Sequence, residues 1–145
     1  MTDARRYPTR PFLAVSAAIF RDGNVLVVRR ARTPALHLYT LPGGVVETGE
    51  SLTEAVVREV REETALTVEP AGLAGYREAI GRDAENRVER HFVILSFAAR
   101  WRAGEVTLNE ELDDARWLKP PELAGLATTD GLSEIVAAAL ERLKR

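Results

Sequence analysis

Glu59, Glu62 and Glu63 recur at a spacing that gathers three carboxylates on one side of a helix, because residues three and four apart are neighbours on a helix surface. They continue the apolar stripe of that helix, which begins at Leu52. Carboxylates at the edge of a buried stripe lose hydration and repel one another, so they must take up protons or bind a cation. Oxygen ligands of this kind favour a hard ion such as Mg²⁺ or Mn²⁺. The pattern therefore predicts a metal site rather than an ordinary acidic surface.

The helix that must position these carboxylates has a marked beginning. Ser51 precedes Glu54 by three residues, which is the spacing of a capping box. No Gly or Pro interrupts residues 52–66, so we expect roughly a dozen helical residues. On the solvent side, Glu54 and Arg58 have the i, i+4 spacing of a favourable ion pair.

This stretch resembles the Nudix hydrolase signature, G-x5-E-x7-R-E-U-x-E-E-x-G-U, in which U is a bulky aliphatic residue. The residues that fall on its fixed positions are Gly44, Glu50, Arg58, Glu59, Val60, Glu62, Glu63 and Leu66. The single departure is Ala65, where the family has a Gly that commonly permits a left-handed helix end. Ala in that conformation costs about 1 kcal/mol, so the departure concerns local stability and not the chemistry.

The resemblance implies a pyrophosphatase, which hydrolyses a nucleoside diphosphate linked to another group as water attacks phosphorus. It implies Mg²⁺ or Mn²⁺ as the cofactor, held by Glu59, Glu62, Glu63 and the carbonyl oxygen of Gly43. Arg58 would orient this cluster by ion pairing, and Glu59 or a more distant acid would be the general base.

The residues that we assign to the substrate-binding side are Arg29, Arg30, Tyr39, Gly44 and Glu50. The arginines end a predicted strand, where they would either contact phosphate or form a solvated strand terminus. Glu50 would support the glycine turn at residues 41–44, which we expect to need dihedral angles that only Gly adopts.

A further acid should come from another loop, because a diphosphate needs its charge neutralised on both sides of the bridging oxygen. Three helix carboxylates can hardly hold several ions alone. The acidic segment 109–114 is the best candidate, with Glu111 as the first choice and Glu110 as the second. A solvated acidic turn is the alternative, and the segment Asp83–Glu89 is the next place to look.

We expect strands at residues 12–20, 25–30, 67–69, 73–80, 91–99 and 115–118, a helical turn at 121–126 and a final helix at 132–145. This order is typical of an α/β protein and is similar to the Nudix fold, an α/β/α sandwich with a mixed β-sheet between helices. Pro70 would end the third strand. The polar segment 81–90 would form a mobile loop over the site or a solvated loop. We interpret residues 1–145 as one domain, with a loose segment at residues 1–10.

Composition excludes several classes of protein. Hydrophobic residues make up 46% of the 145 positions and charged residues 29%, as in a soluble globular domain. Without Cys the chain has no disulfide or thiol nucleophile, which fits a cytoplasmic protein and argues against the isopentenyl diphosphate isomerase branch of the family. The first ten residues have no signal-peptide apolar region, and residues 11–20 are too few to span a bilayer. A net charge of −2 disfavours broad binding to nucleic acid or membrane, and a homodimer is left open.

The substrate is predicted from two segments, YTLPGGVVETGES at residues 39–51 and ARWLKPPEL at 115–123. They look closest to the small ADP-ribose pyrophosphatase-like branch, which is related to MutT. The expected substrate is therefore an ADP-ribose-like nucleotide sugar, giving a nucleoside monophosphate and a phosphorylated product. The alternatives are normal or oxidised dNTPs, diadenosine polyphosphates, and a sensor that binds nucleotide sugars without cleaving them. Such sensors typically lose carboxylates of the signature, and all are intact here.

Overall fold

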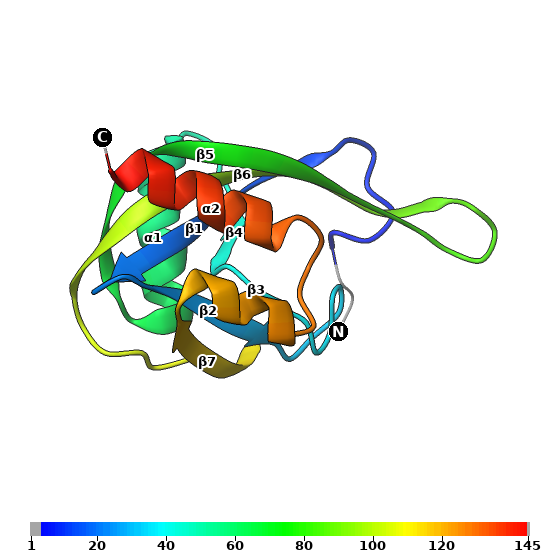
Figure 1. The fold of residues 1–145 in the computed structure, drawn as a ribbon. Coiled ribbons are helices and arrows are strands. Elements are labelled where there is room, and N and C mark those ends of the chain that lie inside the picture. The colour runs from blue at the N-terminus through cyan, green and yellow to red at the C-terminus, as the bar shows by residue number, and fades with distance from the viewer. Residues whose placement is uncertain (1–3, 145) are drawn as a thin grey trace.

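A mixed β-sheet lies between two helices in the structure, a computed structural model that describes residues 4–144 (Figure 1). The elements in chain order are β1 (Phe12–Arg21), β2 (Asn24–Arg30), β3 (Tyr39–Thr40), β4 (Gly43–Val45), α1 (Leu52–Thr64), β5 (Thr67–Arg82), β6 (Val88–Ala103), β7 (Leu112–Leu118), the 3₁₀ helix η1 (Pro120–Gly125) and α2 (Leu132–Leu143). The predicted α/β sandwich is therefore confirmed. The helical turn and the final helix are also confirmed, although Arg145 lies outside the described residues.

Strand β1 occupies the centre of the sheet, and its two ends pair with different antiparallel strands. The strand order is β3-β2-β1-β6-β5, with β4 beside β1 and β7 beside β2. Strand β1 runs parallel to β6 and antiparallel to β2 and β4. It pairs with β2 only at its C-terminal end, whereas its N-terminal half pairs with β4, where Ser16 faces Gly43 and Val15 faces Gly44. The two glycines are thereby fixed beside the central strand.

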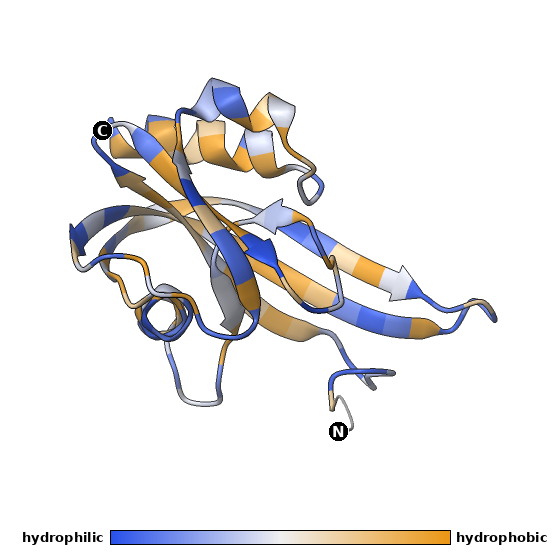
Figure 2. Cartoon of the chain, turned by 90° about the horizontal axis from the view of Figure 1, so that it is seen from below, coloured by the Kyte–Doolittle hydropathy of each residue, from blue (hydrophilic) through white to orange (hydrophobic). Residues whose placement is uncertain are grey.

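Two apolar layers hold the helices against opposite faces of this sheet (Figure 2). Helix α1 buries Ala55, Val56 and Val60 against one face. Helix α2 buries Val136 and Ala139 against the other. The apolar stripe predicted for the helix that begins at Leu52 is confirmed, and both helices pack on the sheet through their apolar side chains.

Both ends of α1 follow the local chemistry of the sequence. The Ser51 hydroxyl accepts the backbone N–H of Glu54 at 3.1 Å, and the Glu54 carboxylate accepts the backbone N–H of Ser51 at 3.0 Å. This confirms the capping box. At the other end Ala65 has a φ of 66° and donates its N–H to the carbonyl oxygen of Arg61. The helix therefore ends in the left-handed conformation for which the signature has Gly.

One prediction about β5 was wrong, and the loop between β5 and β6 has other bounds than we expected. Pro70 does not end a strand, because it lies within β5 and faces Ala99 between two irregularities of the ladder. Strand β5 is at the edge of the sheet, where a residue without an N–H is tolerated. The polar segment 81–90 forms a shorter loop than we expected, since β5 extends to Arg82 and β6 begins at Val88, which leaves residues 83–87 as the turn between them. The resulting hairpin projects away from the body of the molecule rather than over α1 (Figure 1).

The N-terminal segment contacts this hairpin. Arg6 forms an ion pair with Glu89 at 2.6 Å, and the Tyr7 hydroxyl donates to the Asp83 carboxylate at 2.8 Å. Residues 1–3 of the segment that we expected to be loose lie outside the described residues. Within residues 4–144, no helix is long and apolar enough to cross a membrane.

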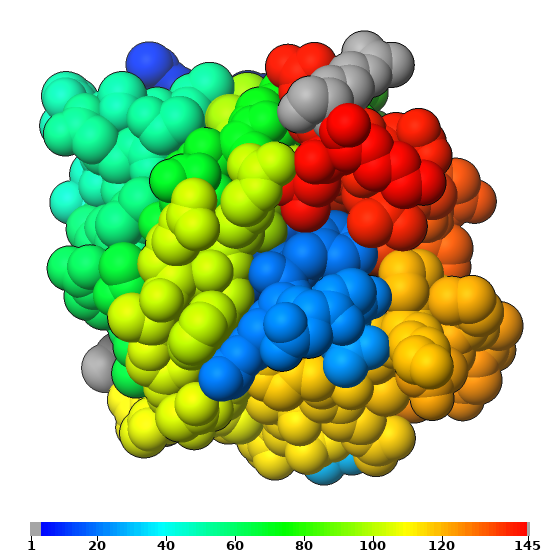
Figure 3. Space-filling view, turned by 60° about the vertical axis from the view of Figure 1, so that its left-hand side comes forward, coloured from blue at the N-terminus to red at the C-terminus, as the bar shows by residue number. Residues whose placement is uncertain are grey.

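Figure 3 shows the end of the sheet where the β1–β2 turn, in blue, lies between β6 in yellow-green, β7 and η1 in gold and the end of α2 in red. Trp101 of β6 packs against the apolar core between the sheet and α1, which we call the α1-side core, and its indole N–H donates to the carbonyl oxygen of Gly104. The guanidinium of Arg21 lies 3.8 Å from the centre of the indole ring. Trp117 also packs against this core. Both tryptophans are therefore packing residues.

Candidate active site

Gly43 and Gly44 of β4 lie next to two carboxylates of α1, those of Glu63 and Glu59. The backbone N–H of Gly43 donates to the Glu63 carboxylate at 2.9 Å. A Cβ at residue 44 would lie 2.4 Å from the Glu59 carboxylate, and one at residue 43 would lie 2.0 Å from the carbonyl oxygen of Val15. Neither glycine has a positive φ, so our expectation of glycine-only dihedral angles was wrong. Close approach to the backbone of β1 is what requires Gly at residue 43, whereas a Cβ at residue 44 would displace the end of the Glu59 side chain.

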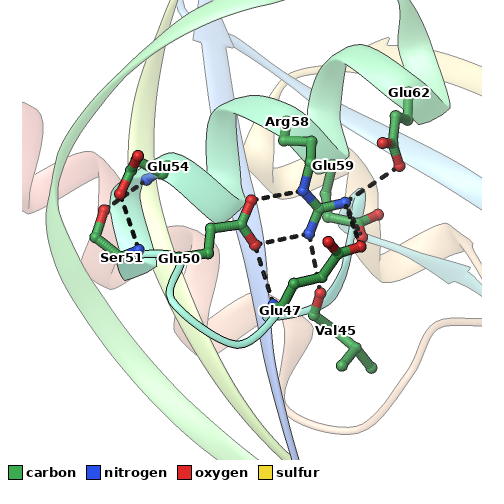
Figure 4. Close-up of polar contacts among 8 residues, drawn as sticks. All are labelled: Val45, Glu47, Glu50, Ser51, Glu54, Arg58, Glu59 and Glu62. Carbon is green, nitrogen blue, oxygen red and sulfur yellow. Dashed lines mark hydrogen bonds and ion pairs between the residues drawn. The ribbon is translucent and has the colours of Figure 1, made fainter.

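Arg58 joins the remaining acids of the signature to the same strand (Figure 4). Its guanidinium forms a two-point ion pair with Glu50, with N–O distances of 2.6 and 2.8 Å. It also donates to Glu59 at 2.9 Å and to Glu62 at 3.3 Å. A last bond, of 3.1 Å, reaches the carbonyl oxygen of Val45. Arg58 thus orients Glu59 and Glu62 by ion pairing, which is the arrangement that the sequence predicted.

Two details of this network differ from the sequence-based prediction. Arg58 has no contact with Glu54, because the Glu54 carboxylate caps the helix and Glu50 occupies the guanidinium. Glu50 does not contact the glycines either. Glu50 is linked to β4 through Arg58, which donates to the carbonyl oxygen of Val45. Glu63 is the acid that accepts the backbone N–H of Gly43.

The environment raises the pKa of the inner carboxylates. Glu63 is only 4% exposed, and burial raises its pKa to about 8; the negative charges of Glu111 and Glu59 add to this rise, while the N–H of Gly43 opposes it. Burial also raises the pKa of Glu59, although the bond from Arg58 opposes this change. By contrast, the ion pair with Arg58 lowers the pKa of Glu50 to about 2. Two acids of the site are therefore costly to ionise without a nearby cation.

These acids fit a hard divalent cation by their chemistry. Glu59 and Glu63 are desolvated oxygen donors whose anionic forms a cation would stabilise. Glu62 is the exposed member, with its side chain 57% accessible and bonded to Arg58. Within the described part of the chain, no three acidic or histidine side chains already converge around one point.

Glu111 lies near the helix carboxylates, and Glu110 points elsewhere. The negative charge of Glu111 raises the pKa of both Glu59 and Glu63. Glu111 is exposed just before β7, and its backbone N–H donates to the Asn109 side chain. Glu110 instead forms an ion pair with Arg32 at 3.4 Å. The hairpin acids Asp83 and Glu89 bind Tyr7 and Arg6.

The three side chains predicted to contact substrate, those of Arg29, Arg30 and Tyr39, do not form one cluster. Arg29 donates to Asp113 at 2.6 Å, and the Tyr39 hydroxyl donates to Asp114. Tyr39 belongs to the apolar core between the sheet and α2. Arg30 is separate from this pair: it donates to the carbonyl oxygen of Pro34, and its positive charge lowers the pKa of Glu63. Among these three side chains, Arg30 is the one whose charge acts on the helix carboxylates.

The fold and the site together are typical of a hydrolase. Acidic side chains of helix α1 contact the glycines of strand β4 within a mixed sheet, and Arg58 bonds to one of these acids. The family model described as NUDIX domain matches residues 10–139. The chain therefore belongs to the NUDIX family, and the predicted enzyme class, a Nudix hydrolase, is confirmed.

Comparison with individual proteins gives the same family. An ADP-ribose pyrophosphatase of Methanocaldococcus jannaschii is 32% identical over 117 residues, which cover 81% of this chain and 67% of that protein. A NAD-capped RNA hydrolase NudC of Pseudomonas entomophila is 31% identical over 94% of this chain, which spans about half (48%) of that longer relative. Among solved structures, the MutT protein from Methanosarcina mazei Go1 superposes with a TM-score of 0.76 at 25% identity, over 95% of this chain and 99% of that one.

Proposed function

We propose that this chain hydrolyses the diphosphate bond of an ADP-ribose-like nucleotide sugar, releasing a nucleoside monophosphate and a phosphorylated sugar. The observation that carries the proposal is the pair of desolvated carboxylates, Glu59 and Glu63, packed against the glycine backbone of β4. The substrate class is supported by the relative from Methanocaldococcus jannaschii that is named ADP-ribose pyrophosphatase.

Glu59, Glu62 and Glu63 are the proposed ligands of Mg²⁺ or Mn²⁺, together with the carbonyl oxygen of Gly43. When bound, such a cation neutralises diphosphate oxygens and lowers the pKa of a bound water. The chain's own contribution is to hold the acids in place. The guanidinium of Arg58 donates to the Glu59 carboxylate, and the backbone N–H of Gly43 donates to the Glu63 carboxylate.

The reaction joins one water oxygen to phosphorus and breaks the bond from that phosphorus to the bridging oxygen. The proton released by the water needs a carboxylate acceptor. We assign this role to Glu111, since its charge acts on Glu59 and Glu63 and no partner within residues 4–144 binds its carboxylate. Glu59 is the alternative base, but its carboxylate is already bonded to Arg58.

A panel of substrates tests the proposal. The purified chain is mixed with Mg²⁺ and ADP-ribose, NAD, 8-oxo-dGTP or diadenosine tetraphosphate, and the nucleotide products are separated by ion exchange. We expect AMP and ribose 5-phosphate from ADP-ribose, with a kcat/KM at least about tenfold above the other compounds. A higher kcat/KM for the dNTP, with release of inorganic diphosphate, would favour the MutT-like alternative. Tight binding of ADP-ribose without any product would favour the sensor.

A further inference from the structure

The outer edge of strand β5 has no pairing partner along the part of the hairpin that leaves the body of the molecule. Strand β5 is the last strand of the sheet, and within residues 4–144 the backbone of residues 76–82 forms hydrogen bonds with β6 alone. Helix α2 packs on β5 before this segment, at Gly72 and Gly75, and the hairpin then projects beyond both helices (Figure 1). An uncovered strand edge presents a row of N–H and C=O groups, which is a template for pairing with another strand.

The sequence and the geometry of this segment leave the edge open to a further strand. The contacts that Arg6 and Tyr7 make with the hairpin go to its turn and to β6, not to the outer edge of β5. Residues 75–82, GYREAIGR, include neither Lys nor Pro, two of the residues with which proteins protect a strand edge. The ladder with β6 is regular from Gly75 to Gly81. The segment is therefore straight and regular enough to pair with another strand.

The charges of β5 favour one register for pairing with a second copy of the same strand. Twofold symmetry places one residue opposite itself and pairs the others antiparallel around it. An axis at Arg77 or Glu78 would set identical charges directly opposite each other, which is destabilising. An axis at Ala79 would set Glu78 against Ile80, without a charge partner. An axis at Ile80 sets Ile80 against its own counterpart and Glu78 of each copy against Arg82 of the other. These side chains are exposed at alternate positions of the strand, so they share one face.

We propose that the outer edge of β5 is a self-association surface, on which a second copy of this chain pairs antiparallel along residues 78–82 with the twofold axis at Ile80. The two sheets then continue into one. The side chain of Ile80, 48% exposed in the single chain, is covered by its counterpart and flanked by two ion pairs between Glu78 and Arg82. Pairing along so short a segment buries less area than a standard interface, so we expect a weak dimer with a Kd on the order of 10–100 µM. This surface is independent of the proposed function.

Sedimentation velocity of the full chain tests this surface at concentrations from about 5 to 300 µM, a range that brackets the expected Kd. Wild type is compared with Glu78→Arg and Arg82→Glu, each of which sets like charges opposite each other in both ion pairs. Each variant should raise the Kd about tenfold or more. An equimolar mixture of the two variants should form a mixed dimer with a Kd within about threefold of wild type, because the exchanged charge of each copy then faces an opposite charge on the other.

Glu134→Arg is the matched control, because it reverses one exposed charge at the start of α2 and should associate like wild type. Thermal unfolding checks that each variant is folded. If Arg82→Glu does not fold, since Arg82 also bonds to the Asn86 carbonyl oxygen, Ile80→Lys replaces it, sets two like charges at the axis and should likewise raise the Kd about tenfold.

Two results would overturn the surface: a wild type that stays monomeric up to about 300 µM, or charge-reversed β5 variants that associate as strongly as Glu134→Arg. A mixture of Glu78→Arg and Arg82→Glu that associates no more strongly than either variant alone would overturn the register at Ile80.

Discussion

The carboxylate of Glu63 and the backbone N–H of Gly43 form a hydrogen bond of 2.9 Å that joins helix α1 to strand β4. This bond holds a 4% exposed acid against the central part of the sheet. One N–H does not offset the loss of hydration, because the pKa of Glu63 remains raised, to about 8. The acid is thus protonated or charge-compensated near neutral pH, which links stability, pH and cation binding at one residue.

The first prediction is that the metal-free protein loses stability as pH rises from about 4.5 toward 8 because of Glu63. The unfolded chain releases this proton near the ordinary value of 4.5, whereas the folded chain keeps it up to about 8. Over that range the folded state binds more protons, so the free energy of unfolding falls with rising pH. Urea unfolding in EDTA should show this slope in wild type and a flatter one in Glu63→Gln.

Glu62→Gln is the matched control for this experiment, since Glu62 is adjacent in sequence but 57% exposed. It should keep the slope of wild type. The same pH dependence in wild type and Glu63→Gln would show that Glu63 is not the group responsible.

The second prediction concerns Arg58, which contacts Glu50 at 2.6 Å and the Val45 carbonyl oxygen at 3.1 Å. Arg58→Lys should lower the free energy of unfolding by about 1–3 kcal/mol, because one ammonium cannot replace a fork that binds several oxygens. It should also lower kcat, since Glu59 loses its lateral support. Urea unfolding and initial rates measure the two effects.

Arg61→Gln serves as the control, because Arg61 is exposed in the same helix and has no carboxylate within 4 Å in the described part of the chain. Its stability should stay within about 0.5 kcal/mol of wild type. An Arg58→Lys protein as stable and active as this control would remove Arg58 from the site.

The third prediction is that Ala65→Gly stabilises the protein. Ala65 has a φ of 66°, a conformation that costs Ala about 1 kcal/mol relative to Gly. The free energy of unfolding should therefore rise by up to about 1 kcal/mol. Ala138→Gly, at an exposed position inside α2, should have the opposite effect and lower it by about 1 kcal/mol. A fall in both variants would mean that the left-handed helix end is not strained.

The fourth prediction assigns the distal acid. Glu111→Gln should reduce kcat by about 10²-fold with little change in melting temperature, because Glu111 acts on Glu59 and Glu63 while its side chain is exposed. Glu110→Gln should have a small effect, since Glu110 pairs with Arg32. Glu134→Gln, at the start of α2 on the other side of the sheet, is the surface control. If Glu111→Gln behaves like Glu134→Gln, the base is Glu59.

Local signals in the sequence were sufficient for the elements that carry the site. The Ser51–Glu54 capping box and the left-handed helix end at Ala65 both depend on neighbouring residues, and both occur as expected. The spacing of Arg58, Glu59 and Glu62 likewise placed their side chains in one ion-pair network.

The errors came from contacts between residues far apart in the chain. The bond from Gly43 to Glu63 spans 20 residues, so no local pattern indicates which acid binds the glycine strand. The β5–β6 ladder carries the chain through Pro70 and through the polar residues near Gly81, because pairing with a neighbouring strand outweighs local propensity.

The most direct test of the central claim, a cation-dependent diphosphate hydrolase centred on Glu59, Glu62 and Glu63, is the rate of AMP release from ADP-ribose in excess EDTA and after addition of Mg²⁺ or Mn²⁺. Wild type should show no turnover in EDTA and recover with the cation, whereas Glu62→Gln and Glu63→Gln should remain about 10²-fold or more slower at saturating cation. Undiminished turnover in EDTA, or wild-type rates in both variants, would contradict the claim.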